Sequence, residues 1–184
     1  MNTLSFPLSN QLVVVMAPHA AMPMMVEMSA RLALNGSVRV LDGGNRFNVY
    51  PVAQAVRRLT PRLEETLSHI TLSRAFTCYQ VVALLEQTPS RAVPTLVLDI
   101  LSTFLDESVT LEESMRLLKV CIDHLTRLSR SAPVVVSAKP LLTLSAGRAP
   151  LVDALLESAS RTVVLETPRP LPPAALPLWE QAAD

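Results

Sequence analysis

The sequence is poor in several residue types that would assign it to a specialised class of protein. It has two cysteines, Cys78 and Cys121, which are too few and too far apart for a disulfide framework or a zinc site. Both are predicted to be buried thiols. Aromatic residues make up only 4% of the chain and charged residues 17%, whereas hydrophobic residues make up 49%. This composition argues against disorder and indicates one folded domain with a sizeable core.

The chain also lacks a membrane span, a secretory signal and an excess of either charge. No apolar run approaches the roughly 18 to 20 uncharged residues of a transmembrane helix. Residues 1–11 lack the basic start and cleavage pattern of a signal peptide, so a cytoplasmic protein with no membrane association is expected. Sixteen basic residues balance sixteen acidic ones. Nucleic-acid binding is therefore expected to be weak and to depend on a local patch.

Common catalytic signatures are missing as well. The chain has no Gly-x-Ser-x-Gly elbow, no His/Cys metal cluster and no Gly-x-Gly-x-x-Gly turn. The three histidines, His19, His69 and His124, are far apart in sequence, and none stands beside a nucleophile. The sequence thus gives little reason to expect an enzyme of one of these classes, and it offers no candidate catalytic or metal-binding set.

What the sequence does contain is an alternation of short apolar runs and amphipathic stretches. The runs are rich in β-branched residues and predict buried strands. The clearest amphipathic stretch begins with a capping box at Thr110 and Glu113. Such alternation predicts βαβ units, and hence an α/β fold with a mainly parallel central sheet covered by helices. Central strands are predicted at residues 11–16, 38–41, 95–99, 133–137 and 161–165, a more exposed strand at 70–74, and helices at 24–34, 52–59, 63–67, 78–87, 110–128 and 150–158.

The composition changes near the end of the chain. Residues 1–167 are predicted to form the folded domain, and residues 168–184 a proline-rich tail that contains the lone Trp179. A chain restricted by proline loses less entropy when it docks, and Trp is a frequent interface anchor. The tail is therefore expected to pack on its own domain or to dock on a partner.

Polar residues follow the predicted strands at the position where open parallel sheets bind their ligands, beyond the carboxyl ends of the strands. The candidates for ligand or anion binding are Asp42, Arg46, Arg74, Asp99 and Lys139. Their order, with Phe47 after Asp42 and an apolar helix after Ser73-Arg74-Ala75-Phe76, resembles the core of the RecA/RadA recombinase and KaiC-like ATPase superfamily over roughly residues 12–165. The resemblance implies a RecA-like three-layer sandwich.

The departures from this superfamily are as informative as the matches. A working phosphate loop, Gly-x-x-x-x-Gly-Lys-Ser/Thr, gathers backbone N–H groups, an ammonium group and a hydroxyl around phosphate and Mg²⁺. The family's general-base Glu falls on Gly44, which has no side chain to orient water. We therefore expect no ordinary ATP hydrolysis, at most weak binding of ATP with Mg²⁺, and no cofactor. The four phosphate-loop positions correspond to Ala17, Met22, Pro23 and Met24.

Two other positions of the family carry a polar or charged side chain here as well. Asp99 keeps the acidic position linked to Mg²⁺, although it could equally cap the next loop, and Lys139 replaces a Gln. The resemblance also places DNA contacts in the connections after Asp99 and after the late strand. Both connections are short here, and residues 140–150 carry only one basic residue, Arg148.

Two functions remain open. The first is a non-catalytic RecA/RadA-like paralogue, an accessory or protein-interaction subunit in DNA recombination or repair, whose partner is a recombinase or a second copy of itself. The Met-rich segment 22–28 would suit a contact surface, although Met25 and Met28 are expected in the core. The second is a non-hydrolysing domain that binds nucleotide, phosphate or single-stranded nucleic acid through basic residues at the strand ends and on the helices after them, namely Arg46, Arg57, Arg58, Arg74 and Lys139. Arg57 and Arg58 are expected on a solvated helix face.

Overall fold

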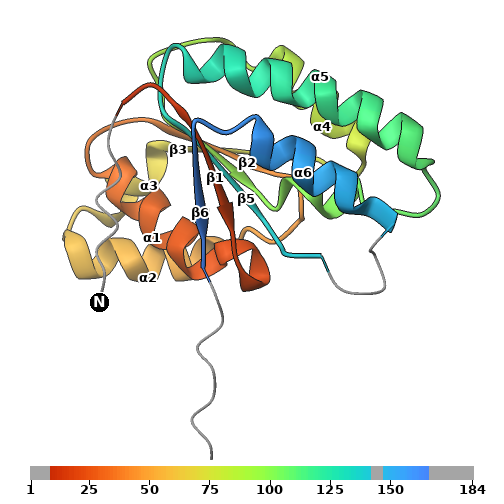
Figure 1. The fold of residues 1–184 in the computed structure, drawn as a ribbon. Helices are drawn as coiled ribbons and strands as arrows, with labels where there is room; N and C mark the ends of the chain where they lie inside the picture. Colours follow the sequence, from red (N-terminus) through yellow and green to blue (C-terminus); the bar gives the residue numbers. More distant parts are fainter. Residues whose placement is uncertain (1–8, 142–146, 166–184) are drawn as a thin grey trace, which may run out of the picture.

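The computed structural model describes residues 9–141 and 147–165 of the 184-residue chain. These residues form an α/β three-layer sandwich, in which a six-stranded parallel sheet lies between two layers of helices (Figure 1). The predicted fold class, a RecA-like three-layer sandwich with a mainly parallel sheet, is confirmed at the level of architecture. The domain boundary predicted at residue 167 and the proline-rich tail 168–184 lie outside the described residues.

The strand order is β3-β2-β4-β5-β1-β6. The four inner strands are almost wholly buried, because helices cover both of their faces. The prediction that residues 161–165 form a central strand is wrong: they contain an edge strand, which pairs with β1 and packs Val163 and Leu165 on one core only. The strands are β1 (Leu12–Met16), β2 (Val38–Asp42), β3 (Ile70–Arg74), β4 (Thr95–Leu98), β5 (Val134–Ala138) and β6 (Arg161–Val164).

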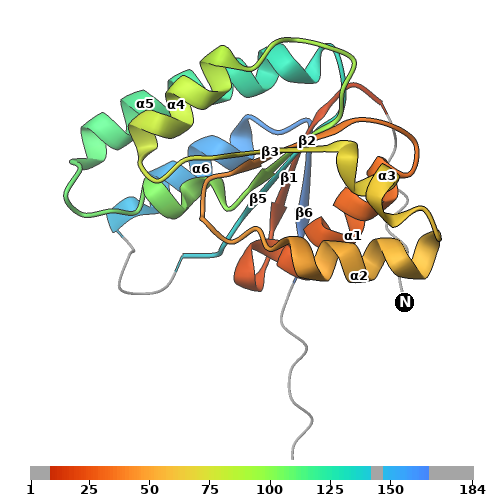
Figure 2. The same cartoon turned by 180° about the vertical axis from the view of Figure 1, so that it is seen from behind.

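Three helices cover each face of the sheet, and each face has its own apolar core (Figure 1, Figure 2). Met25 and Met28 are buried in the core on one face of the sheet, and Cys78 and Cys121 are buried in the core on the opposite face, as predicted. Helices α1 (Met22–Ala33), α2 (Val49–Leu59) and α3 (Leu63–Ser68) lie on one face, and α4 (Cys78–Gln87), α5 (Leu111–Ser129) and α6 (Ala149–Glu157) on the other. Within the two described stretches of chain, none of these helices combines the length and the apolar character of a membrane span.

The strand order creates three switch points at the carboxyl edge of the sheet. Strands β1 and β2 are each followed by a helix on one face, whereas β4 and β5 are each followed by a helix on the other. Because β3 is also followed by a helix on that second face, α4, the chain leaves the sheet in opposite directions between β3 and β2, between β2 and β4, and between β5 and β1. Ligands of open parallel sheets bind at such switch points. Two short 3₁₀ segments, η1 (Pro18–Ala21) and η2 (Ile100–Thr103), lie at this edge and were not predicted from the sequence.

Candidate functional site

The five predicted ligand-site residues come together at the carboxyl edge of the sheet. Each lies at a strand end or just beyond one, on β2, β3, β4 and β5 or the loops that follow them. Ion pairs join Arg74 to Asp42, and join both Arg46 and Lys139 to Asp99. We call this group of three cations and two carboxylates the rim cluster.

Asp42 is fully buried and holds the loop that follows β2. Its carboxylate accepts hydrogen bonds from the backbone N–H groups of Arg46 (3.0 Å) and Phe47 (2.9 Å). Arg74 Nε lies 3.3 Å from Asp42 Oδ2, and Arg74 also donates a 2.6 Å hydrogen bond to the Phe47 carbonyl. The loop itself thus satisfies the Asp42 carboxylate, which makes this residue an anchor for residues 43–48.

Asp99 is 1% exposed, and its charge is balanced by two cations of the protein. Asp99 Oδ2 lies 3.1 Å from Arg46 Nε and 2.7 Å from Lys139 Nζ. Neither contact has the geometry of a directed hydrogen bond, so the pairing is one of charge. Burial of an unpaired carboxylate would cost several kcal/mol, on the order of the penalty for any buried ion, and the two cations offset that penalty. The Asp99 side chain does not cap the η2 turn, so that sequence-based alternative is wrong.

Gly44 lies directly against Asp99. A Cβ atom at position 44 would lie 2.7 Å from Asp99 Cβ and 2.9 Å from Asp99 Oδ2, and real Cβ atoms essentially never show contacts under 3.0 Å. Position 44 therefore has no room for a larger side chain, such as the glutamate that the resemblance would place there, while Asp99 stays in place.

Several backbone N–H groups of the loop between β1 and α1 donate to carbonyls of the protein itself. The N–H groups of Ala17 and Ala20 donate to the carbonyls of Ala138 and Ala17. The Met22 N–H donates to the carbonyl of His19, and the next residue, a proline, has no N–H. These backbone N–H groups are therefore not free to bind a phosphate.

The same loop has an unusual backbone. His19, Ala20 and Ala21 have φ angles of 54°, 52° and 53°, a left-handed conformation that residues with side chains rarely adopt. His19 is exposed in this turn, as expected of a loop histidine. Met24 is half-buried and Pro23 exposed at the start of α1. The structure therefore places apolar side chains at the phosphate-loop positions.

The other basic residues considered from the sequence are engaged elsewhere. Arg58 lies in the last turn of α2, far along that helix from the rim cluster, and pairs with Glu27 at 3.4 Å. Arg57 is exposed in the same turn, so the predicted solvated face is confirmed. Arg148 donates hydrogen bonds to the Phe104 carbonyl (2.7 Å) and the Ser114 hydroxyl (3.0 Å), and is used inside the fold.

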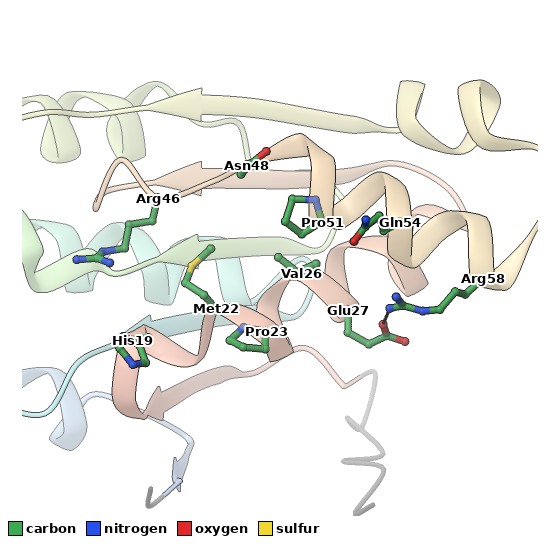
Figure 3. A pocket seen from close by; sticks show the side chains of 10 residues that line it. All are labelled: His19, Met22, Pro23, Val26, Glu27, Arg46, Asn48, Pro51, Gln54 and Arg58. Carbon is green, nitrogen blue, oxygen red and sulfur yellow. Dashed lines mark hydrogen bonds and ion pairs between the residues drawn. The ribbon is translucent and has the colours of Figure 1, made fainter.

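Two cavities flank Arg46. Neither can be predicted from local sequence patterns, because both depend on how separate elements pack. One, of about 640 Å³, lies between α1 and α2 (Figure 3). The other, of about 620 Å³, lies beside the edge strand β3 and is lined by Arg74, Leu72 and Val49 among others. Within the residues that the structure describes, no group of three or more His, Cys, Asp or Glu side chains is placed to hold a metal ion.

Neither a scan against protein-family models nor a search of curated proteins gave a match. The RecA/RadA resemblance therefore stays a prediction, carried by the order of residues along the chain. The rim cluster does not fit Mg²⁺-ATP. Lys139 pairs with the Asp99 carboxylate that would have to face the metal, and apolar side chains stand where the resemblance would place a phosphate loop.

Replacement of Gly44 with Ala is expected to lower the free energy of unfolding by about 1–3 kcal/mol, because the new methyl group would push Asp99 away from its cations. The matched control is Gly147→Ala, since a Cβ atom there would meet nothing within 4 Å. Its expected effect is within about 0.5 kcal/mol of wild type. Urea unfolding followed by circular dichroism measures both variants, and equal stabilities would contradict the close packing at Gly44.

Titration calorimetry with ATP and Mg²⁺ is expected to show no binding with a micromolar Kd. Pro23→Lys should not restore hydrolysis, because Gly44 supplies no general base, and it should not create a tight site, because the pair between Lys139 and Asp99 remains. A tight, Mg²⁺-dependent nucleotide site in the wild-type chain would show that the loop after β1 rearranges to accept phosphate. That result would overturn the description of the site given above.

Proposed function

We propose that this domain is a non-catalytic RecA/RadA-like paralogue that acts as a protein-interaction subunit, with recombination or repair of DNA as its setting. The observation that carries the interaction role is a concentration of exposed apolar side chains at one edge of the sheet. The rim cluster supports the absence of catalysis, because the groups that would handle a nucleotide neutralise one another. The setting rests on the sequence resemblance alone.

Most of the exposed apolar side chains come from β3 and from the segments that follow β2 and β3. Seven large hydrophobic residues are exposed in the part of the chain that the structure describes, and five of them come from this edge. Three of the five are aromatic, and aromatic residues are enriched at protein interfaces. We call these five residues the edge patch: Val49 and Tyr50 at the start of α2, Leu72 in β3, and Phe76 and Tyr79 around the start of α4.

The number of exposed residues from neighbouring segments distinguishes the edge patch, and not the exposure of any one of them, since Val164 outside it is 64% exposed. Tyr50 is 62% exposed and Phe76 63% exposed, and scattered single residues would need no explanation. Several such residues around one pair of strand ends are typical of a surface that a partner covers. The two remaining exposed residues, Leu34 and Val164, come from other parts of the fold, the end of α1 and the opposite edge strand.

The partner that we propose is a RecA/RadA-type recombinase or a second copy of the chain. Light scattering of the full chain, alone and mixed with the recombinase of its own organism, tests this. Association with one of the two is expected. Combined Tyr50→Ser and Phe76→Ser substitutions should weaken it by at least about tenfold, because buried aromatic anchors dominate interface energies.

The matched control combines Leu34→Ser and Val164→Ser, which remove exposed apolar side chains away from the edge patch. This variant is expected to associate like the wild type. A wild-type chain that stays monomeric and ignores the recombinase would refute the proposal. Equal losses in the two double variants would refute the edge patch as the contact surface.

A further inference from the structure

We infer that the groove between α1 and α2 binds a small organic anion that consists of one carboxylate group on an apolar body. The groove is the cavity of about 640 Å³ beside Arg46 (Figure 3). Its volume falls in the range of about 300–1,000 Å³ that is usual for small-molecule sites. The inference is independent of the protein-interaction role, which rests on a different surface.

The walls of the groove are mainly apolar. Met22, Pro23 and Val26 line it from the first turns of α1, and Pro51 faces them from the first turn of α2 (Figure 3). These four side chains offer a ligand no charge and no hydrogen-bond donor. An apolar molecule is therefore the complementary occupant of the middle of the groove.

The end of the groove near the sheet carries an excess of positive charge. The rim cluster contains three cations and two carboxylates, so one positive charge is unbalanced. Helices α1 and α2 both begin at this end, neither has an acidic residue in its first turn, and α1 has no side-chain cap. The partial positive charge of a helix N-terminus adds to the excess. A group with a single negative charge is therefore favoured here.

Arg46 is the residue placed to meet that group. Its side chain is 44% exposed, lines the groove, and approaches Asp99 most closely through Nε, at 3.1 Å. The terminal guanidinium nitrogens suit a carboxylate, with which arginine forms paired hydrogen bonds. Asp99 stays neutralised if Arg46 turns to a ligand, because Lys139 remains 2.7 Å from it. The ligand thus does not leave a buried charge without a partner.

The opposite end of the groove is a weaker anchor. Glu27 there pairs with Arg31 at 2.9 Å and with Arg58 at 3.4 Å. The two arginine side chains are 58% and 66% exposed, so solvent and salt screen their charge. We therefore place the carboxylate at the Arg46 end and the apolar body along α1 and α2. A polyphosphate is disfavoured, because only one charge is unbalanced and Met22 and Pro23 occupy the walls.

The test is a titration of the ¹⁵N-labelled full chain with 2-naphthoate, followed by NMR, with 2-naphthalenemethanol as a neutral analogue of similar shape. Saturable shifts are expected for amides in the first turns of α1 and α2, with a Kd of about 1 mM or tighter for a ligand of this size. The alcohol should bind about tenfold more weakly, because it lacks the charge that pairs with arginine.

Three variants locate the site. Arg46→Gln should weaken naphthoate about tenfold and leave the alcohol unchanged, since it removes one charged partner. Val26→Phe should abolish binding of both compounds by filling the groove, and Arg58→Gln, the matched control, should stay within about twofold of wild type. The spectra of the free variants report whether each is folded.

Two results would overturn the inference. One is the absence of saturable shifts around the groove of the wild-type chain at naphthoate concentrations well above 1 mM, the scale expected for a ligand of this size. The other is equal weakening by Arg46→Gln and Arg58→Gln, which would show general attraction to positive charge. Either outcome leaves the edge patch and its partner untouched, so the two proposals fail separately.

Discussion

The buried carboxylate of Asp99 is the group on which the carboxyl edge of this fold depends. It lies at the end of β4 and takes its counter-charges from the loop after β2, through Arg46, and from the residue after β5, Lys139. One charge thus ties three segments of the edge together. Because the carboxylate lies against position 44, the loop after β2 must carry glycine there. A second buried carboxylate, Asp42, holds the same loop by accepting hydrogen bonds from the backbone N–H groups of Arg46 and Phe47.

This arrangement explains why an edge at which parallel sheets commonly bind ligands offers few free polar groups here. Two of the three positive charges of the rim cluster are balanced by the protein's own carboxylates, and the N–H groups of Ala17, Ala20 and Met22 donate to its own carbonyls. What remains accessible lies to either side: the edge patch beside β3 and the apolar groove between α1 and α2. The functions that we propose therefore reside on these surfaces, to either side of the rim cluster.

Local patterns made much of the fold predictable. The strand at residues 70–74 and the helix at residues 78–87 have the predicted bounds, and Thr110 caps α5 by accepting from the Glu113 N–H as its sequence indicates. The meeting of the five rim residues followed from the rule that parallel strands share one carboxyl edge. The edge position of β6 was missed, because strand order depends on distant contacts. The left-handed turn at residues 19–21 was missed because it contains no glycine, and the groove because it arises from the packing of two helices.

The coupling between Asp99 and Lys139 tests this account most directly. Asp99→Asn, Lys139→Met and the double variant would be compared with the wild type by urea unfolding. If the pair holds the edge together, the double variant loses less stability than the sum of the two single losses, by about 1 kcal/mol or more. Losses that simply add would mean that the two charges do not stabilise each other, and would contradict the account.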